Sequence, residues 1–185
     1  NTFEGIQKKY KPYTEELLVH LSDNGLFTCP ASTALNMHNC FEGGLLDHIL
    51  RVGKYTTEIN KLLPESLRQE VAPIVRVCFL HSIGKVGLYE DNDSKWLKEN
   101  LSQYFIYKND DKVNMKIGER SAHLAMKYGV ELTDFEYQSI INAYKDLSED
   151  AQAKYFSDTL TVILKQGIEL SQMEEKKIWE DFNKK

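Results

Sequence analysis

The segment from Leu45 to Leu63 carries the clearest periodic pattern in the chain. Its apolar residues fall mostly on one face of a helix, because they recur at spacings of three and four. Pro64 follows directly and cannot continue the helix. A second segment, Leu67 to Ile83, is apolar around most of its circumference, which is typical of a buried helix. The two segments predict a helical core, with Pro73 marking a kink or a helix start.

Most of the remaining chain is also predicted to be helical. Thr133 and Glu136 have the spacing of a capping box, in which each side chain bonds the other residue's backbone N–H at a helix start. Gly129 ends the helix before it. The further predicted helices run from about 12 to 24, 118 to 128, 133 to 145 and 151 to 171, and a charged tail over 174–185 is expected to dock as a helix.

One stretch favours strands over helix. Gln103 to Lys108 is rich in aromatic and β-branched residues, and turn-forming residues at 109–111 separate it from Lys112 to Met115. We therefore predict an all-α fold, a helical bundle with a small β-hairpin insertion. A chain of 185 residues suits a single domain over 1–185, with its core at about 12–171.

Charge and composition restrict the class of partner. The formal net charge is -5, which argues against broad binding to nucleic acid or to an anionic membrane. It leaves room for a local basic pocket. No stretch approaches the roughly 18 apolar residues of a membrane span. The three cysteines form no CxxC pair, which suggests a reducing compartment, and we expect a cytoplasmic protein of undefined oligomeric state.

Two short motifs contain the histidines of greatest interest. Residues 42–48 read Glu-Gly-Gly-Leu-Leu-Asp-His, and residues 79–85 read Phe-Leu-His-Ser-Ile-Gly-Lys. They resemble the first two metal-binding motifs of the HD-domain phosphohydrolases, Glu-Gly-Gly-Leu-Leu-Glu-His and Leu-His-Asp-Ile-Gly-Lys. The lead-in Phe27 to Thr33 and the segment Leu132 to Glu136 resemble one bacterial and phage subgroup of that family. The resemblance implies the helical HD-domain fold and a bacterial cell as host, with a phage gene as one source.

The resemblance also implies six ligand positions for one or two metal ions, which activate water for attack on phosphorus. His48 and His81 match the first two positions. The Asp of the family's His-Asp pair falls on Ser82. Two further His positions fall on Ile117 and Ala143, and the position of a late Asp falls near Ile168. Isoleucine and alanine cannot bind a metal, and serine is a poor ligand. We therefore expect no catalytic residue and no bound metal or other cofactor, with His48 and His81 as vestigial ligands.

The favoured function is that of a catalytically degenerate HD-domain protein. It would bind a protein partner, or a small phosphorylated ligand in the former active-site cleft. The candidate cleft residues are His38, His48, His81, Ser82, Lys85 and Glu119.

Other interpretations of the same residues remain open. One alternative is an active phosphohydrolase of nucleotides or phosphate esters with a site rebuilt around His48 and His81. Such an enzyme would use Mn, Fe or Mg, and Asp47 or Glu119 would replace a missing metal ligand. Another is a purely structural subunit. In the simplest interpretation His48 and His81 are core side chains that hydrogen-bond each other or a backbone carbonyl.

Overall fold

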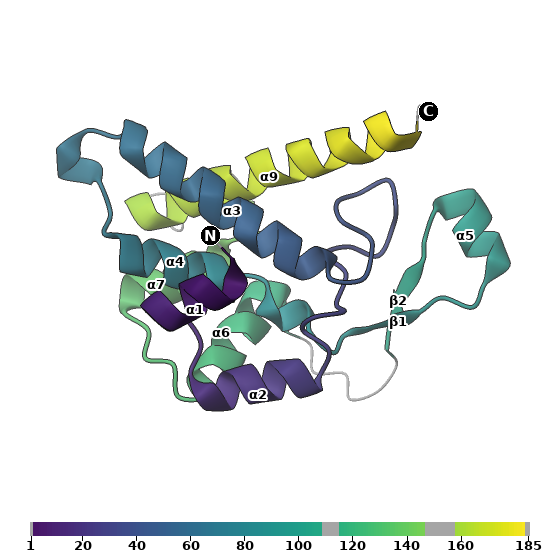
Figure 1. The fold of residues 1–185 in the computed structure, drawn as a ribbon, viewed down its shortest axis with the longest axis horizontal. Coiled ribbons are helices and arrows are strands. Elements are labelled where there is room, and N and C mark those ends of the chain that lie inside the picture. Colours follow the sequence, from purple (N-terminus) through teal and green to yellow (C-terminus); the bar gives the residue numbers. More distant parts are fainter. Residues whose placement is uncertain (1, 109–114, 147–157, 184–185) are drawn as a thin grey trace.

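The protein is mostly helical and carries one small antiparallel sheet, as the sequence predicts (Figure 1). The computed structural model describes residues 2–108, 115–146 and 158–183. No helix within these ranges is both long and apolar enough to span a bilayer. The helices are α1 (Phe3–Tyr10), α2 (Glu15–Asp23), α3 (Gly44–Leu62), α4 (Val71–Leu80), α5 (Lys95–Leu101), α6 (Ile117–Lys127), α7 (Asp134–Asn142) and α9 (Thr159–Asn183), with short 3-10 turns η1 (Glu65–Leu67) and η2 (Ile83–Lys85).

Helix α3 forms the centre of the molecule. It packs most extensively against α9, which runs alongside it in the opposite direction, and next against α4 (Figure 1). Its inner face buries Leu45, Ile49 and Val52 completely, and these side chains join the main hydrophobic core. The periodic apolar pattern is therefore the contact face with two other helices. Burial of such a face, rather than intrinsic propensity, supplies most of a helix's stability.

Helix α4 begins at Val71, later than the predicted start at Leu67. Pro73 lies in its first turn, where its missing N–H breaks no helical hydrogen bond. Residues 65–67 form the separate turn η1. The capping box at Thr133 and Glu136 is present and begins α7, although this helix ends at Asn142, three residues before the predicted end.

Both ends of the chain differ from the prediction. Helix α1 was not predicted, and the helix expected from Pro12 begins at Glu15, because Thr14 caps it by accepting from the N–H of Leu17. At the other end, α9 continues through the segment expected to be a separate tail. Of the three residues expected to dock, Trp179 is half-buried, whereas Ile178 and Phe182 are 52% and 79% exposed. The predicted start of this last helix, 151–157, lies outside the described residues.

The sheet pairs different segments from those expected. Strand β2 (Phe105–Tyr107) lies within the predicted strand, but its partner is β1 (Tyr89–Asp91), with α5 between them in the sequence. The expected partner, residues 112–115, lies mostly outside the described residues, and Met115 is not in a strand. Tyr89 pairs with Tyr107, and their rings lie 5.2 Å apart between centroids. We call residues 89–107 the arm, because Figure 1 shows them projecting from the helical body.

Candidate functional site: a buried histidine cluster

The glycines at the start of α3 bring His38 close to His48. Gly43 adopts a positive φ of 79°, and a Cβ on Gly44 would collide with the carbonyl of Asn39. The Asn39 side chain donates to the Asp47 carboxylate at 2.7 Å, which ties this loop to α3. The ring centroids of His38 and His48 are consequently 5.0 Å apart.

His81 reaches the same place from the end of α4. Its ring lies 5.6 Å from that of His48 between centroids, and both side chains are fully buried. The His81 Nδ1–H donates to the carbonyl of Cys78 at 2.7 Å. Because a carbonyl can only accept, Nδ1 carries the proton and the neutral ring keeps its lone pair on Nε2. This bond to a backbone carbonyl is the one expected of a core histidine.

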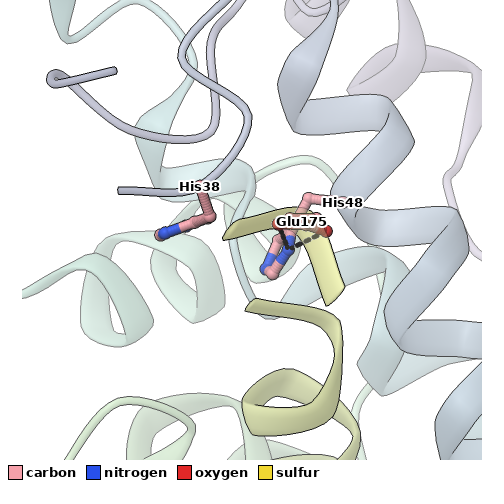
Figure 2. A group of neighbouring side chains, drawn as sticks. All are labelled: His38, His48 and Glu175. Carbon is pink, nitrogen blue, oxygen red and sulfur yellow. Dashed lines mark hydrogen bonds and ion pairs between the residues drawn. The ribbon is translucent and has the colours of Figure 1, made fainter. Parts of the chain in front are cut away.

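A carboxylate from α9 completes the cluster. Glu175 places its two oxygens 3.0 and 3.1 Å from His48 Nδ1 (Figure 2), and its side chain is 0% exposed. Glu175 is not among the residues predicted for the site, because a glutamate in a charged tail is typical of a solvated helix face. One signal pointed to it. Ile168, which matches the family's late Asp, lies seven residues earlier and therefore on the same face of the helix.

Burial sets the protonation states within the cluster. It lowers the pKa of His38 and of His48 to about 3, and that of His81 well below its ordinary value. Burial also raises the pKa of Glu175 to about 8, against the opposing effect of the nearby Arg51 guanidinium. The interior thus disfavours isolated charges, and the histidines are neutral at pH 7.

Lys85 and Ser82 lie in the same interior. Lys85 is 6% exposed, and its Nζ donates to the carbonyl of Ala31 at 2.5 Å. The same ammonium lies 5.3 Å over the ring of Tyr144, a ring that is 5.7 Å from that of His81. Burial lowers the pKa of Lys85 to about 8. Ser82 follows His81 and is fully buried.

The structure brings most of the candidate cleft residues together, with one exception. Glu119 accepts a hydrogen bond from the backbone N–H of Lys116 at 3.1 Å and caps α6. Within the described part of the chain, the carboxylate grouped with the histidines is that of Glu175. Ala143 and Ile168, which fall at two ligand positions of the motifs that the sequence resembles, belong to the buried hydrophobic core.

The donor atoms of the cluster suit a transition-metal ion. The Nε2 atoms of His38, His48 and His81 are buried and have no hydrogen-bond partner among the described residues. One donor atom each from His38, His48 and Glu175 lie within 4.8 Å of one another. Imidazole nitrogen with carboxylate oxygen is a donor set that Zn, Mn or Fe accepts. These three residues would therefore hold such an ion.

The cluster is nevertheless closed to solvent. His48, His81 and Ser82 are each 0% exposed. Cavities of about 700, 430 and 370 Å³ indent the molecule, and all three are lined by residues other than the cluster histidines. A catalytic metal site keeps one coordination position open to water and substrate, and the described part of the chain shows no such opening at His48 or His81.

Comparison with known proteins gives no match to any family model, to any curated protein or to any solved structure.

Proposed function

We propose that this chain is a catalytically degenerate HD-like module that acts by binding a protein partner rather than by hydrolysing a phosphate ester. The closed histidine cluster is the observation that carries this proposal. Hydrolysis needs a metal-bound water and a phosphorus atom within reach of it. His48, His81 and Ser82 are fully buried, and Glu175 occupies one nitrogen of His48. The Lys85 ammonium in the same interior also opposes a dication.

The same closure argues against a phosphorylated ligand at this site and in favour of a protein bound elsewhere. The arm supplies the surface. Its helix α5 has only seven residues and buries none of them. Helices this short are marginal in water unless something packs against them. Trp96, Leu101 and Tyr107 on the arm are 62%, 52% and 61% exposed. Exposed aromatic and apolar side chains on a projecting element are characteristic of protein interfaces.

Site-specific photo-crosslinking tests the partner surface. A variant with a photoreactive residue at position 96 is mixed with extract from the source cells and irradiated. A variant with the same residue at position 62 is the control. Leu62 is 86% exposed but lies at the far end of α3 from the arm (Figure 1). We expect one discrete adduct from position 96 and none from position 62. Excess wild-type protein without the photoreactive residue should reduce the amount of adduct, whereas an excess of the W96S/L101S variant should not. Equal labelling from both positions, or equal competition by both proteins, would refute the arm as the interface.

A second function is favoured by one specific observation, the grouping of His38, His48 and Glu175 donor atoms within 4.8 Å. In that case the chain is a metal-dependent phosphohydrolase. His38, His48 and Glu175 would hold Mn, Fe or Mg, which supplies an activated water when bound. Lys85 would contribute a positive charge near the phosphoryl oxygens.

Hydrolysis of p-nitrophenyl phosphate, bis-p-nitrophenyl phosphate and nucleoside monophosphates, each with Mn, Fe or Mg, decides between the two functions. The binding proposal predicts that the wild-type protein and His48→Ala give the same background rate. Metal-dependent turnover that disappears in His48→Ala and in Glu175→Gln would establish the second function and defeat the first.

A further inference from the structure

The largest of the three cavities lies between three helices and contains none of the cluster histidines. Its volume is about 700 Å³, and α1, α3 and α4 form its walls. We call it the α1–α3–α4 groove. We call its apolar lining the floor, which includes Ile6, Leu50, Ile74, Val75, Cys78 and Phe79. Ile6, Leu50 and Val75 are only half-buried, so the floor retains apolar surface that solvent can reach.

The rim of the groove carries positive charge. Two of the basic residues already form ion pairs within the protein: Arg51 with Asp47 at 2.9 Å and Lys61 with Glu58 at 2.7 Å. Lys9 on α1 and Lys54 on α3 form no ion pair with a carboxylate among the described residues. Lys54 lies within longer electrostatic reach of Glu174. The two ammonium groups lie over the rings of Tyr10 and Tyr55, at 4.8 and 5.3 Å.

A glycine in the wall leaves the groove wide. Gly53 lies in the interior of α3, where glycine weakens a helix. Packing does not require it, because an added Cβ would meet only the Cβ of Cys78, at an ordinary 3.9 Å. Gly53 lines the groove, so its missing side chain contributes open volume there.

We infer that the α1–α3–α4 groove binds a small amphipathic anion, a single apolar chain ending in a carboxylate or phosphate. The apolar floor would cover the chain, and Lys9 and Lys54 would pair with the head group. A volume of about 700 Å³ falls in the range of small-molecule pockets, which are mostly apolar with a few placed polar groups. This inference is independent of the function proposed for the arm.

Isothermal titration of the whole chain with decanoate, dodecanoate and dodecyl phosphate, below their micelle concentrations, tests the inference. We expect saturable binding of one ligand per chain. Affinity should rise about threefold to fourfold for each added methylene, because each buries further apolar surface. Comparison of dodecanoate with dodecyl phosphate identifies the preferred head group. Dodecyltrimethylammonium has the same tail and the opposite charge, and it should bind about tenfold more weakly or not at all.

Variants test the floor and the rim separately. Gly53→Leu should abolish binding by filling the groove, and leucine favours helix, so α3 should persist. The K9E/K54E variant should weaken dodecanoate binding about tenfold. Lys8→Glu is the matched control, because Lys8 is exposed on the same helix and does not line the groove, and its affinity should be unchanged. Thermal melts confirm that each variant folds.

Three results would overturn the inference. One is the absence of saturable binding at one ligand per chain. Another is equal affinity for the cationic detergent. The third is unchanged affinity in both Gly53→Leu and K9E/K54E when their melts show folded protein.

Discussion

Ser82 and Glu175 together determine the chemistry of the histidine cluster. The sequence places a hydroxyl beside His81, where the motifs that it resembles have a carboxylate, and the structure places a carboxyl group from α9 beside His48. The Glu175 carboxyl group binds His48 Nδ1 at 3.0 Å, and the Nε2 atom of that ring has no hydrogen-bond partner among the described residues. A partner of this kind fixes the orientation of the ring. At the scale of single residues, the cluster resembles a packed polar core more than an open active site.

The neutral histidines predict a loss of stability in acid. In the folded protein the pKa of His38 is lowered to about 3 by burial, whereas in the unfolded chain it is near the ordinary 6.5. The unfolded chain therefore binds more protons below pH 6.5, and the free energy of unfolding falls as pH drops from there toward 3. Each such histidine contributes a slope of about 1.4 kcal/mol per pH unit in this window. Glu175 acts in the opposite sense, because its raised pKa gives stability that is lost as pH rises through about 8.

Urea denaturation across this pH range measures the effect. Between pH 6.5 and 3, the acid limb of the plot of unfolding free energy against pH, His38→Gln should reduce the slope by the contribution of one proton. His123→Gln is the control, because His123 is exposed on α6, and it should follow the wild type. Parallel acid limbs for the wild type and His38→Gln would show that His38 does not remain neutral in the folded protein.

At the scale of elements, glycines set how closely the helices approach one another. The N–H of Gly84 in η2 donates to Ser121 Oγ at 2.9 Å, and Ser121 donates onward to the His81 carbonyl at 3.1 Å. A Cβ on Gly84 would collide with the backbone carbonyl of Ile117. Backbone atoms cannot move aside as a flexible side chain can, so this junction fixes η2 and the neighbouring histidine against α6.

Two glycine-to-alanine changes should therefore have opposite signs. Gly84→Ala should lower the free energy of unfolding by about 2 kcal/mol or more, through overpacking against Ile117. Gly53→Ala should raise it by about 0.5 to 1 kcal/mol, because its Cβ meets Cys78 at 3.9 Å and alanine favours helix. Urea midpoints at constant m-value give both numbers. A stabilising Gly84→Ala would mean that η2 and α6 are less tightly apposed than described.

At the scale of the whole molecule, the helices that carry a clear local sequence pattern could be predicted from the sequence. The apolar period gave α3, Gly129 ended α6, and the Thr133–Glu136 pair began α7. Helix α1 was missed because it is short and has no buried residue to form a stripe. The partner of β2 was missed because strand pairing is non-local, and the intervening α5 offers no hairpin signal.

The site was likewise predictable only where local motifs identify its residues. His38, His48 and His81 were selected from motifs, and the structure brings their rings together. The contact between His48 and Glu175 joins residues 127 positions apart, and the motif around His48 does not identify its partner. It depends on the antiparallel course of α3 and α9 (Figure 1). Burial, and with it the closure of the cluster, is likewise a property of the assembled helices.

Chemical modification of the histidines tests this closure most directly. Diethyl pyrocarbonate acylates neutral imidazole that solvent can reach, and mass spectrometry of peptides reads each histidine separately. The exposed His123 should react about tenfold faster or more than His48 and His81, which become accessible only through local opening. Reaction of His48 and His81 at the rate of His123 would contradict the account, because it would show that substrate-sized molecules enter the cluster.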